Sequence, residues 1–570
     1  MNEKKIEQLK ACVDRKDLAR LLGFKPKALS YILYQRTPCQ NYRTFKIPKR
    51  KGGERVIDAP NPELLFLQKR ASNLLQDCLD EIVQDEGHKR TIHHGFQRKK
   101  SIITNARVHR ARKFVFNVDL TDFFPSVNFG RILGFFQKNR HFTLEREVAV
   151  TLAQICCYDG QLPQGAPTSP VVSNLICQPL DIRLSRLAEK FGCSYSRYAD
   201  DITFSTSTRK FPRAISRKSL ISSKWYSGRI LKKEIKSAGF AINPKKTRMQ
   251  YAQSRQTVTG LIVNDKINVP ADYTRLCRAM VDAYVKSGTY FIRKEKLSKS
   301  GKVKVTKEPG TDLQLIGRYS FIHNVKSSNF SKENPRPKDL FSYEKDYRRL
   351  LLFSKFHFSK IPLILTEGKT DTIYIKAALR RLHKSYPTLI TKKGRSFEYN
   401  FDFFKFSPTN RRILGIDGGT SHLAGFLSTY RKEAKSFCPI LNQKPVICII
   451  DNDNGAKKFF KWTDSSGNKI NRDGEVYHLF ENVYLLLTPL KNGTEDSKIE
   501  DFFTKHTLNE KIGGKSFNPE NVGVTEAEYG KAWFASKVVW PKKSTINFNN
   551  FKPLLDLIEN TAMKVHNPKK

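Results

Sequence analysis

The feature that most constrains this chain is a pair of adjacent aspartates between two short apolar segments. Asp200 and Asp201 lie between the predicted strands 193–198 and 202–205, which together read as a β-hairpin. Neighbouring side chains of a regular strand point to opposite faces, so only a tight turn lets both carboxylates approach one point. Two like charges held close repel unless a cation lies between them, and hard oxygen ligands suit Mg²⁺. The pattern predicts a metal site, with a plain acidic turn as the alternative.

A third carboxylate lies at the end of an earlier apolar run. The β-rich segment 114–118 ends at Asp119, and an acid there, beside the hairpin, would complete a two-metal site. Such a site aligns an attacking hydroxyl, polarises a phosphoryl group and stabilises the leaving oxygen. Between these elements, the segment 162–170 contains Gly165, which allows a backbone close to a ligand, and Ser169-Pro170, a good helix opening.

The order of these motifs resembles the palm of reverse transcriptases. Asp-x-x-x-Phe-Phe begins at position 119, Pro-Gln-Gly at 163 and Tyr-Ala-Asp-Asp at 198, and the resemblance covers most of the first 330 residues. Two further signatures are similar to the retron branch of that family: Asn-Ala-x-x-His at 105–109 and Val-Thr-Gly at 258–260. Retron relatives grip their own structured RNA near these signatures and the thumb. The residues expected to bind RNA are Asn105, His109, Val258, Thr259, Gly260, and Arg275 and Arg278 of a helix predicted at 271–286.

The resemblance implies that Asp119, Asp200 and Asp201 bind two Mg²⁺ ions and carry nucleotidyl transfer. Leu120, next to the first of them, is included among the metal-binding positions. Phe124 lies where reverse transcriptases place an aromatic gate against the 2′-hydroxyl of an incoming ribonucleotide. A core aromatic residue is the alternative interpretation of this phenylalanine.

Five further residues are expected to bind the incoming nucleotide. Gln164 and Gly165 would contact the nucleotide and the template. Two predicted strands, joined by Lys-Arg-Lys-Gly-Gly, resemble the fingers hairpin, and their Lys49 and Arg55 would bind the triphosphate. A solvated basic turn is the alternative. Lys246 falls in the segment that supplies a general acid to pyrophosphate, although the preceding residue is also a lysine.

A second set of acids follows a predicted parallel sheet. The expected strands are 361–366, 412–416, 446–450 and 483–488, and strands that alternate with helices indicate a small α/β domain. Open α/β sheets place their ligands at the strand ends. The acids at or after these ends are Glu367, Asp371, Asp451, Asp453 and Glu500, and Asp-x-Asp puts two carboxylates on one side of an extended segment.

This segment resembles a Toprim domain, the metal-binding module of topoisomerases, primases and certain nucleases. The resemblance implies that Glu367 is a general acid/base or a metal ligand and that Asp451 and Asp453 bind Mg²⁺. Asp371 and Glu500 would support a second ion. A Toprim fold that has lost catalysis and only binds or senses nucleic acid is the alternative.

We therefore expect an α+β right-hand polymerase with fingers, palm and thumb, followed by an α/β Toprim domain with a small parallel sheet. The N-terminal helices would pack on the fingers, or form a helix-turn-helix. The expected segments are a helical region (1–40), fingers and palm (41–255), a thumb and RNA-binding region (256–325), a linker (326–360), the Toprim domain (361–510) and an extension of no predicted role (511–570).

Composition indicates the partner and the compartment. The 102 Lys and Arg against 54 Asp and Glu give a formal net charge of +48, which favours a polyanion such as nucleic acid as the partner. Ten cysteines without Cys-x-x-Cys spacing favour reduced thiols in a cytoplasm. No apolar run approaches the ~20 residues of a membrane span, and the first residues lack a secretory apolar core.

The combined expectation is a retron RNA-directed DNA polymerase that uses dNTPs to copy part of a cognate non-coding RNA into multicopy single-stranded DNA. Family behaviour implies priming from a guanosine 2′-hydroxyl, which leaves a branched RNA–DNA molecule. The Toprim part would be a Mg²⁺-dependent nuclease that this hybrid inhibits and that phage infection releases against host nucleic acid. A homo-oligomer is compatible with the sequence.

Overall fold

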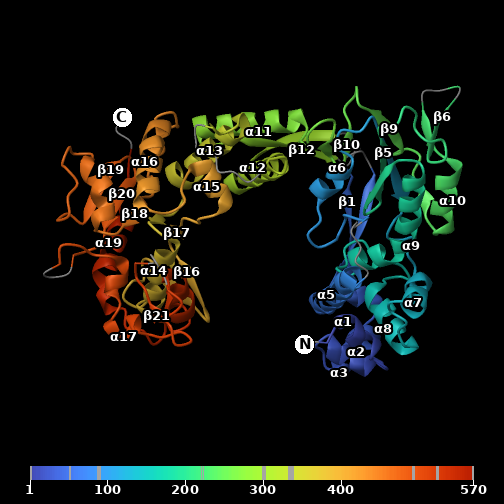
Figure 1. Ribbon diagram of the computed structural model, residues 1–570, viewed down its shortest axis with the longest axis horizontal. Helices are drawn as coiled ribbons and strands as arrows, with labels where there is room; N and C mark the ends of the chain where they lie inside the picture. The colour runs from blue at the N-terminus through green and yellow to red at the C-terminus, as the bar shows by residue number, and fades with distance from the viewer. Residues whose placement is uncertain are drawn as a thin grey trace. The chain divides into compact units, whose positions relative to one another are not determined.

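The computed structural model describes residues 3–49, 53–85, 92–219, 221, 224–297, 303–330, 339–490, 494–520 and 525–567 of the chain. It contains two compact units (Figure 1), of which the first comprises Met1–Pro270 with Val325–Phe330, and the second Ala271–Asn324 with Ser331–Lys570. The segment expected to be the thumb is thus divided between the two units. No helix in the described ranges is both long enough and apolar enough to cross a membrane.

The N-terminal unit is built around an antiparallel sheet, called here the palm sheet. Its strand order is β4-β5-β3-β8, and β9 also pairs with β3. The bounds are β3 (Phe114–Thr121), β4 (Ser194–Tyr198), β5 (Asp201–Thr206), β8 (Ala241–Ile242) and β9 (Arg248–Tyr251). β3 is central and five of its eight residues are buried, as expected for a strand flanked on both edges.

Helices and three small hairpins surround the palm sheet. The hairpins are β1 (Tyr42–Pro48) with β2 (Glu54–Pro60), β6 (Ser216–Lys218) with β7 (Trp225–Ser227), and β10 (Thr257–Val258) with β11 (Leu261–Ile262). The α-helices are α1 (Lys5–Lys10), α2 (Arg15–Leu21), α3 (Pro26–Ser30), α4 (Pro38–Asn41), α5 (Pro62–Asp85), α6 (Ile102–Val108), α7 (Phe129–Lys138), α8 (Arg146–Cys156), α9 (Ser169–Lys190) and α10 (Arg229–Ser237). One continuous apolar core joins α1, α5, α8 and α9 to the palm sheet.

The C-terminal unit contains a five-stranded sheet of order β17-β14-β18-β20-β19. The first four strands are parallel, and only the edge strand β19 runs antiparallel to its neighbour. Their bounds are β14 (Leu363–Thr366), β17 (Asp402–Phe403), β18 (Val446–Ile450), β19 (Val476–Phe480) and β20 (Val483–Leu487). β18 and β20 are buried along their whole length, which is why both read as continuous apolar runs.

The remaining elements of this unit cover the sheet or extend from it. The helices are α11 (Ala271–Ser287), α12 (Asp312–Ser327), α13 (Ser342–Leu351), α14 (Lys369–Arg381), α15 (Pro408–Leu414), α16 (Thr420–Ala434), α17 (Lys505–Leu508), α18 (Lys531–Trp533) and α19 (Lys552–Ala562), with short helical turns η3 (Leu352–His357), η4 (Asn454–Lys461), η5 (Ile499–Phe502), η6 (Phe534–Val539) and η7 (Asn549–Phe551). Three hairpins or short ladders are β12 (Phe291–Leu297) with β13 (Val303–Pro309), β15 (Ile390–Lys393) with β16 (Ser396–Tyr399), and β21 (Ser516–Phe517) with β22 (Glu528–Tyr529). α14 and α19 share a core with β18 and β20.

The strand expected at 412–416 is wrong, because these residues end helix α15. The Ser407 side chain caps that helix by accepting a hydrogen bond from the amide of Asn410, and Pro408 occupies the first turn. Gly415, with φ +77°, then ends it in the left-handed conformation. The sheet position next to β14 is filled instead by the two-residue strand β17.

The linker expected at 326–360 is also wrong over its described part. Residues 342–357 form α13 and η3, whose tyrosines, leucines and phenylalanines are largely buried. Arg348 donates hydrogen bonds to the carbonyls of Ile413 and Leu414 and pairs with Glu433 at 2.7 Å. Arg348 therefore anchors this helix in the C-terminal unit, whereas residues 331–338 of the expected linker lie outside the described residues.

Candidate active sites

The palm sheet brings together the three acids expected to form a metal site. β3 and β5 pair antiparallel in a register that sets Asp119 opposite Asp201. The amide of Leu120 donates to the carbonyl oxygen of Asp200 at 3.1 Å, so the hairpin turn is held against the end of β3. Asp119 is buried, whereas Asp201 opens to solvent. The strand end and the turn thus converge, as the spacing of the motifs predicts.

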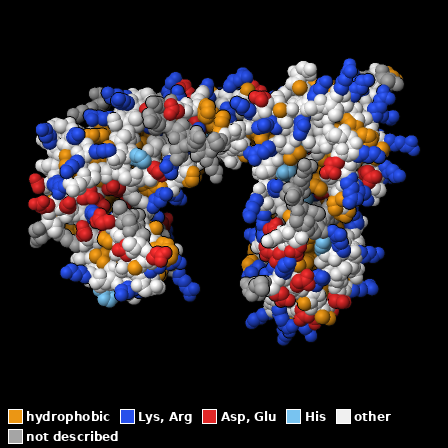
Figure 2. Space-filling view, viewed as in Figure 1, with side chains coloured by type: hydrophobic (Ala, Val, Ile, Leu, Met, Phe, Trp, Pro, Cys, Tyr) orange, Lys and Arg blue, Asp and Glu red, His pale blue; other side chains and the backbone are white. Residues whose placement is uncertain are grey.

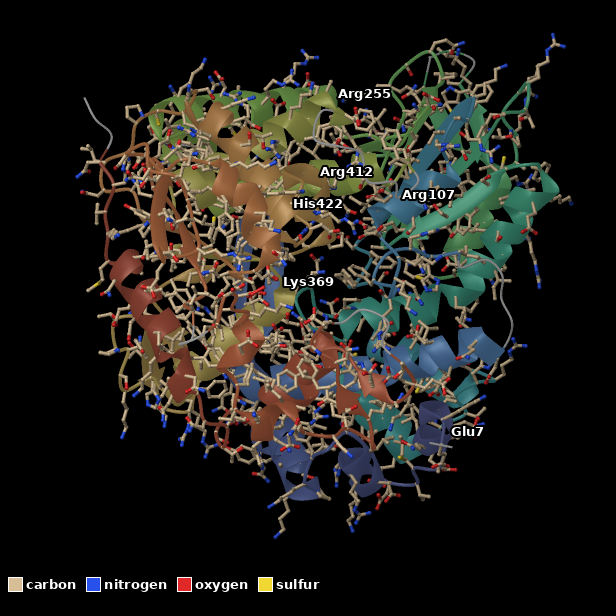
Figure 3. The ribbon with its side chains drawn as sticks, turned by 60° about the vertical axis from the view of Figure 1, so that its left-hand side comes forward. Glu7, Arg107, Arg255, Lys369, Arg412 and His422 are labelled. Carbon is tan, nitrogen blue, oxygen red and sulfur yellow. The ribbon has the colours of Figure 1, made fainter. Side chains whose placement is uncertain are left out.

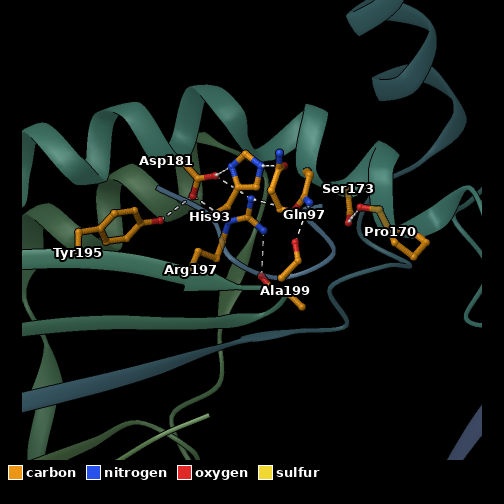
Figure 4. Close-up of polar contacts among 10 residues, drawn as sticks. His93, Gln97, Pro170, Ser173, Asp181, Tyr195, Arg197 and Ala199 are labelled. Carbon is orange, nitrogen blue, oxygen red and sulfur yellow. Dashed lines mark hydrogen bonds and ion pairs between the residues drawn. The ribbon is translucent and has the colours of Figure 1, made fainter. Parts of the chain in front are cut away.

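A buried arginine supports this turn from behind (Figure 4). Arg197, which is fully buried, donates to the Ala199 carbonyl at 3.1 Å. The same guanidinium binds both oxygens of buried Asp181, at 2.8 and 2.7 Å, and Tyr195 donates its hydroxyl to that carboxylate. Ala199 has φ +55°, a conformation that costs free energy for a residue with a Cβ. The sequence carries no local signal for Arg197, because its partner lies on α9.

The acids of this site repel one another. The pKa of Asp200 is raised by burial and by the charge of Asp119. The pKa of Asp201, which is open to solvent on one side only, is raised to about 6 by desolvation from the surrounding protein and by the charges of Asp200 and Asp119. Lys246 partly offsets the charge, since its ammonium lies 2.9 and 3.0 Å from the two oxygens of Asp119. Unbalanced negative charge of this kind favours a bound divalent cation. Among the described residues, no group of three or more His, Cys, Asp or Glu side chains is close enough to enclose an ion as it stands.

The residues expected to bind the nucleotide come from the fingers and from the segment before α9. Arg55, on β2, is exposed, and its positive charge is close enough to offset part of the rise in the pKa of Asp200. Lys49 directly follows β1. The amide of Asp58 donates to the Gln164 carbonyl at 2.8 Å, which joins β2 to this segment. At Gly165, with φ +133°, a Cβ would lie 2.7 Å from the Asp58 carbonyl oxygen, so only glycine fits.

Phe124 is half-buried rather than part of the closed core. Its ring lies 5.3 Å from that of Phe123 and 6.3 Å from that of Phe96, which in turn approaches Tyr198 of the hairpin. The side chain therefore belongs to an aromatic cluster next to the acids, a position compatible with a gate.

Asn105 and His109 are buried and cannot contact RNA directly in this fold, which corrects that expectation. His109 exchanges hydrogen bonds of 2.7 Å with the hydroxyls of Ser205 and Ser196, and Ser196 donates to Asn105 at 2.7 Å. Burial lowers the pKa of His109 to about 3. The motif is thus a neutral brace that fixes α6 to the palm sheet.

The Val-Thr-Gly triplet lies against the same helix. Val258 is buried, and Thr259 (φ +46°) and Gly260 (φ +82°) form the turn between β10 and β11. The Thr259 hydroxyl donates to the Ile102 carbonyl at 3.4 Å. The two retron signatures are therefore neighbours, and only the turn is open to a ligand. On α11, Arg275 and Arg278 are both exposed; Arg275 pairs with Asp272 at 3.6 Å and Arg278 pairs with Asp346 at 2.8 Å.

The second set of acids gathers at the carboxyl ends of β14 and β18. Glu367 follows β14, and its carboxylate accepts hydrogen bonds from the amide (3.2 Å) and hydroxyl (2.8 Å) of Thr420 at the start of α16. The amide of Asp451, which follows β18, donates to the same carboxylate at 3.4 Å. Figure 3 labels Lys369, at the start of α14, and His422, on α16, the two helices that begin beside Glu367.

Four of the five expected acids interact here. The pKa of Asp451 is raised well above its usual value by burial and by the charges of Asp371, Glu500 and Glu367. Asp371 accepts a hydrogen bond from the amide of Gly368 at 2.7 Å, and burial raises its pKa as well as that of Glu500. Asp453 differs, because its side chain caps η4 by accepting from the Gly455 amide at 2.7 Å.

Lys531 is the residue of this site that the sequence does not reveal. It begins α18 in the C-terminal extension, and its ammonium lies 3.0 Å from a carboxylate oxygen of buried Glu500. Burial opposes its charge, but Glu500, Asp451 and Asp371 raise its pKa. Lys531 belongs to no motif at a characteristic distance in sequence from the acids, so only the fold brings this cation to them.

Comparisons with known proteins identify relatives of the N-terminal unit. The family model described as "Reverse transcriptase (RNA-dependent DNA polymerase)" matches residues 47–263. The chain is 33% identical over 336 residues to the retron Mx162 reverse transcriptase of Myxococcus xanthus, which covers 54% of this chain and 62% of that protein. It is 33% identical over 269 residues to the retron Ec86 reverse transcriptase of Escherichia coli, covering 46% and 76%. Among solved structures, a telomerase from Candida albicans aligns with 69% of this chain and 65% of its own chain, with 9% sequence identity and a TM-score of 0.30. The chain thus spans about three fifths of the Mx162 relative.

Proposed function

Because the chain belongs to the family of retron reverse transcriptases, we propose that its N-terminal unit copies RNA into DNA. The observation that carries this proposal is the convergence of Asp119, Asp200 and Asp201 where β3 meets the hairpin turn. Acids from two elements at one point are the arrangement that nucleotidyl transfer requires.

Asp119, Asp200 and Asp201, with Leu120 alongside, would hold Mg²⁺. The donor set fits, since it offers hard oxygen ligands whose mutual repulsion raises the pKa of the two hairpin acids. When bound, Mg²⁺ would activate the primer hydroxyl and stabilise the leaving pyrophosphate. The chain's own part is to fix the acids: Arg197 holds the turn, and the β3–β5 register holds Asp119.

The surrounding residues would position the incoming dNTP. Arg55 and Lys49 on the fingers hairpin would bind the triphosphate, and Lys246 would donate a proton to the departing pyrophosphate. Gln164 and Gly165, packed against Asp58 of β2, would contact the nucleotide and the template, and Phe124 would exclude a ribose 2′-hydroxyl.

The template would be a cognate non-coding RNA and the product a branched RNA–DNA molecule. The net charge of +48 supports a polyanionic partner of this kind. The retron signatures support the same partner: the Val-Thr-Gly turn would contact the RNA, and the buried Asn105 and His109 would fix that turn through α6.

The test is to co-express the protein with its cognate non-coding RNA and to analyse the nucleic acid that co-purifies. We expect a ribonuclease-sensitive, DNA-containing species of defined length from the parent chain, and none from Asp200→Asn. Asp265→Asn, which removes an exposed acid of the same unit, is the matched control. Branched DNA from Asp200→Asn at the parent level would contradict the assignment.

We further propose that the C-terminal unit is a Toprim-type, Mg²⁺-dependent nuclease that acts in anti-phage defence. The support is the cluster of Glu367, Asp371, Asp451 and Glu500 at the ends of parallel strands, where such sheets place their ligands. Placing a toxic nuclease and a polymerase on one chain suggests control by the polymerase product. Equal nuclease activity with and without the bound hybrid would overturn that control.

A non-catalytic module that binds or senses nucleic acid is the second candidate. Asp453 favours it, because this carboxylate is engaged in capping η4 through the Gly455 amide. Glu367→Gln and Asp451→Asn discriminate between the two, with the exposed Asp473→Asn as control. Loss of phage protection only in the first two variants supports the nuclease, and full protection in both supports the binding module.

A further inference from the structure

The acids of the C-terminal unit differ in how far the protein already balances their charge. Asp371 has both carboxylate oxygens engaged: one accepts a hydrogen bond from the Gly368 amide at 2.7 Å and the other from the Thr370 hydroxyl at 3.2 Å. It therefore acts as the capping acid in the first turn of α14. The helix alone explains why this carboxylate lies here.

Glu500 is the buried acid of the cluster. It is 3% exposed, and within the described ranges neither of its oxygens has a hydrogen-bond partner. The group that lies against it is the Lys531 ammonium, 3.0 Å from one oxygen. A buried carboxylate without a counter-charge is strongly destabilising, so this lysine is the cation that the fold provides for Glu500.

Lys531 is both charged and fixed in place. Glu500, with two other acids of the cluster, raises its pKa against the effect of burial, so the side chain is an ammonium at neutral pH. Its helical segment, α18 and η6, is anchored one turn later by Phe534, which is fully buried. The ring of Phe534 lies 5.2 Å from that of Phe503 and 6.0 Å from that of Tyr374 on α14. A backbone shift that moved the lysine away from Glu500 would disturb this packing.

Glu367 and Asp451 form the other half of the cluster and have no such cation. Among the described residues neither carboxylate takes part in an ion pair, and the nearby Lys498 pairs with Glu520 at 2.7 Å instead. Figure 2 shows Asp and Glu side chains gathered on this unit near the position that Figure 1 labels β18 and β20, on a chain that is otherwise rich in Lys and Arg. Unbalanced negative charge here favours a divalent cation, and Mg²⁺ is usually held by one or two carboxylates with several water molecules.

We propose that this cluster binds a single divalent cation, held by Glu367 and Asp451, and that the Lys531 ammonium occupies the place of a second one beside Glu500. The inference rests on the Mg²⁺-dependent nuclease proposed above for the C-terminal unit, and it departs from the second ion that the sequence predicts there. The C-terminal extension, for which the sequence predicts no role, thus supplies part of the site.

The ammonium and a second ion exclude each other for a physical reason. Mg²⁺ needs oxygen ligands at about 2.0–2.1 Å in an octahedral arrangement. An ion bound to Glu500 in this way would lie against the ammonium that already pairs with the same carboxylate. Repulsion between two neighbouring cations is strong at a site with little solvent. Lys531 therefore limits the number of ions as well as balancing the charge of Glu500.

The test counts Mn²⁺ ions bound to the full chain by electron paramagnetic resonance. Mn²⁺ occupies the same oxygen-rich octahedral sites as Mg²⁺ and is paramagnetic. Asp119→Asn and Asp200→Asn, present in every sample, silence the palm site, and the ions lost on adding Asp451→Asn are those of the C-terminal cluster. We expect one ion in the cluster with Lys531 in place. Lys531→Met should raise the count to two, with the spin coupling of ions about 3.5–4 Å apart, as in two-metal sites.

Three further variants separate charge from packing. Lys531→Arg keeps a cation beside Glu500 and should keep the count at one. Lys537→Met removes an exposed lysine of the same helical segment and is the matched control, also with one ion. Lys531→Gln is neutral and still able to donate a hydrogen bond to Glu500, so it should admit the second ion even if Lys531→Met does not fold.

Each count decides between the proposals. Two ions with Lys531 in place, or a single ion in the folded neutral variants, would overturn the inference and leave the nuclease proposal standing. No ion lost on adding Asp451→Asn would overturn both. The expected counts together with no cleavage of RNA or DNA by the metal-loaded chain would overturn the nuclease alone.

Discussion

Replacing Arg197 by methionine should loosen the turn that carries Asp200 while leaving the acids themselves intact. The substitution keeps most of the buried volume but removes every hydrogen bond of the guanidinium. Asp181 then stays buried with the Tyr195 hydroxyl as its hydrogen-bond donor and the His93 ring at 3.8 Å, and the Ala199 carbonyl loses its side-chain partner.

The expected cost follows from the burial of the pair. Arg197 is 0% and Asp181 2% exposed, so solvent cannot replace the lost partner. Removing one member of a buried ion pair typically costs about 3–5 kcal/mol, mainly through the charge left behind. Asp181→Asn combined with Arg197→Met removes both charges and should cost less, about 1–2 kcal/mol.

The assay is native-state hydrogen exchange of the amides in β4 and β5, with primer extension measured in parallel. Exchange of these amides reports on the hairpin itself and does not require the two units to unfold together. We expect faster exchange and reduced extension in Arg197→Met, and partial recovery of protection in the double variant. Arg255→Met, which removes an exposed arginine of the same unit (Figure 3), is the control.

Two results would refute this reasoning. Unchanged exchange in Arg197→Met would mean that the buried pair does not hold the turn. A double variant less protected than the single one would mean that an unpaired Asp181 is not the source of the cost.

Three other perturbations test separate parts of the chain. Gly165→Ala should lower polymerase activity and stability by about 2 kcal/mol, because its Cβ meets the Asp58 carbonyl oxygen at a positive φ; parent-like primer extension and melting would contradict this. His109 has a folded pKa of about 3, below its unfolded value, so its contribution to stability is present above about pH 6.5 and is lost as the pH falls. His109→Gln should therefore flatten the acid side of the stability profile in urea titrations, by up to ~1.4 kcal/mol per pH unit, and an unchanged slope would count against a neutral buried imidazole. Lys531→Met should lower the melting temperature in EDTA, with a loss of unfolding free energy on the order of 2 kcal/mol, and Mg²⁺ should restore part of that stability. Equal melting of variant and parent in EDTA would show that the ion pair with Glu500 contributes nothing.

Several parts of the fold and of the sites follow from local sequence alone. The apolar runs at 114–121, 446–450 and 483–487 are strands because a buried strand needs apolar residues on both faces. Acids near the ends of such strands lie at one end of the sheet, so the convergence of Asp119, near the carboxyl end of β3, with the hairpin acids could be predicted.

The tertiary structure decided what depends on partners far apart in the chain. For residues 412–416 the signals of a helix are local, namely the Ser407 cap, Pro408 and Gly415, and only the choice of β17 for the sheet position beside β14 depends on the folded chain. The sequence of α13 is predicted to be part of a linker. In the folded chain, its Arg348 pairs with Glu433 of α16 and donates hydrogen bonds to two carbonyls at the end of α15. Sequence patterns report a residue's neighbours within a turn or two, whereas these contacts span tens of residues.

The same distinction separates the acids from the cations beside them. The sequence alone pointed to most of the carboxylates of each cluster, since strand ends and turns are local features, but it also included Asp453, which caps η4. Only the folded chain decided that Lys246 reaches Asp119, that Lys531 reaches Glu500 and that Arg197 carries the turn. The physical reason is that a long cationic side chain has no periodic signature and pairs with whichever buried charge the packing brings within reach.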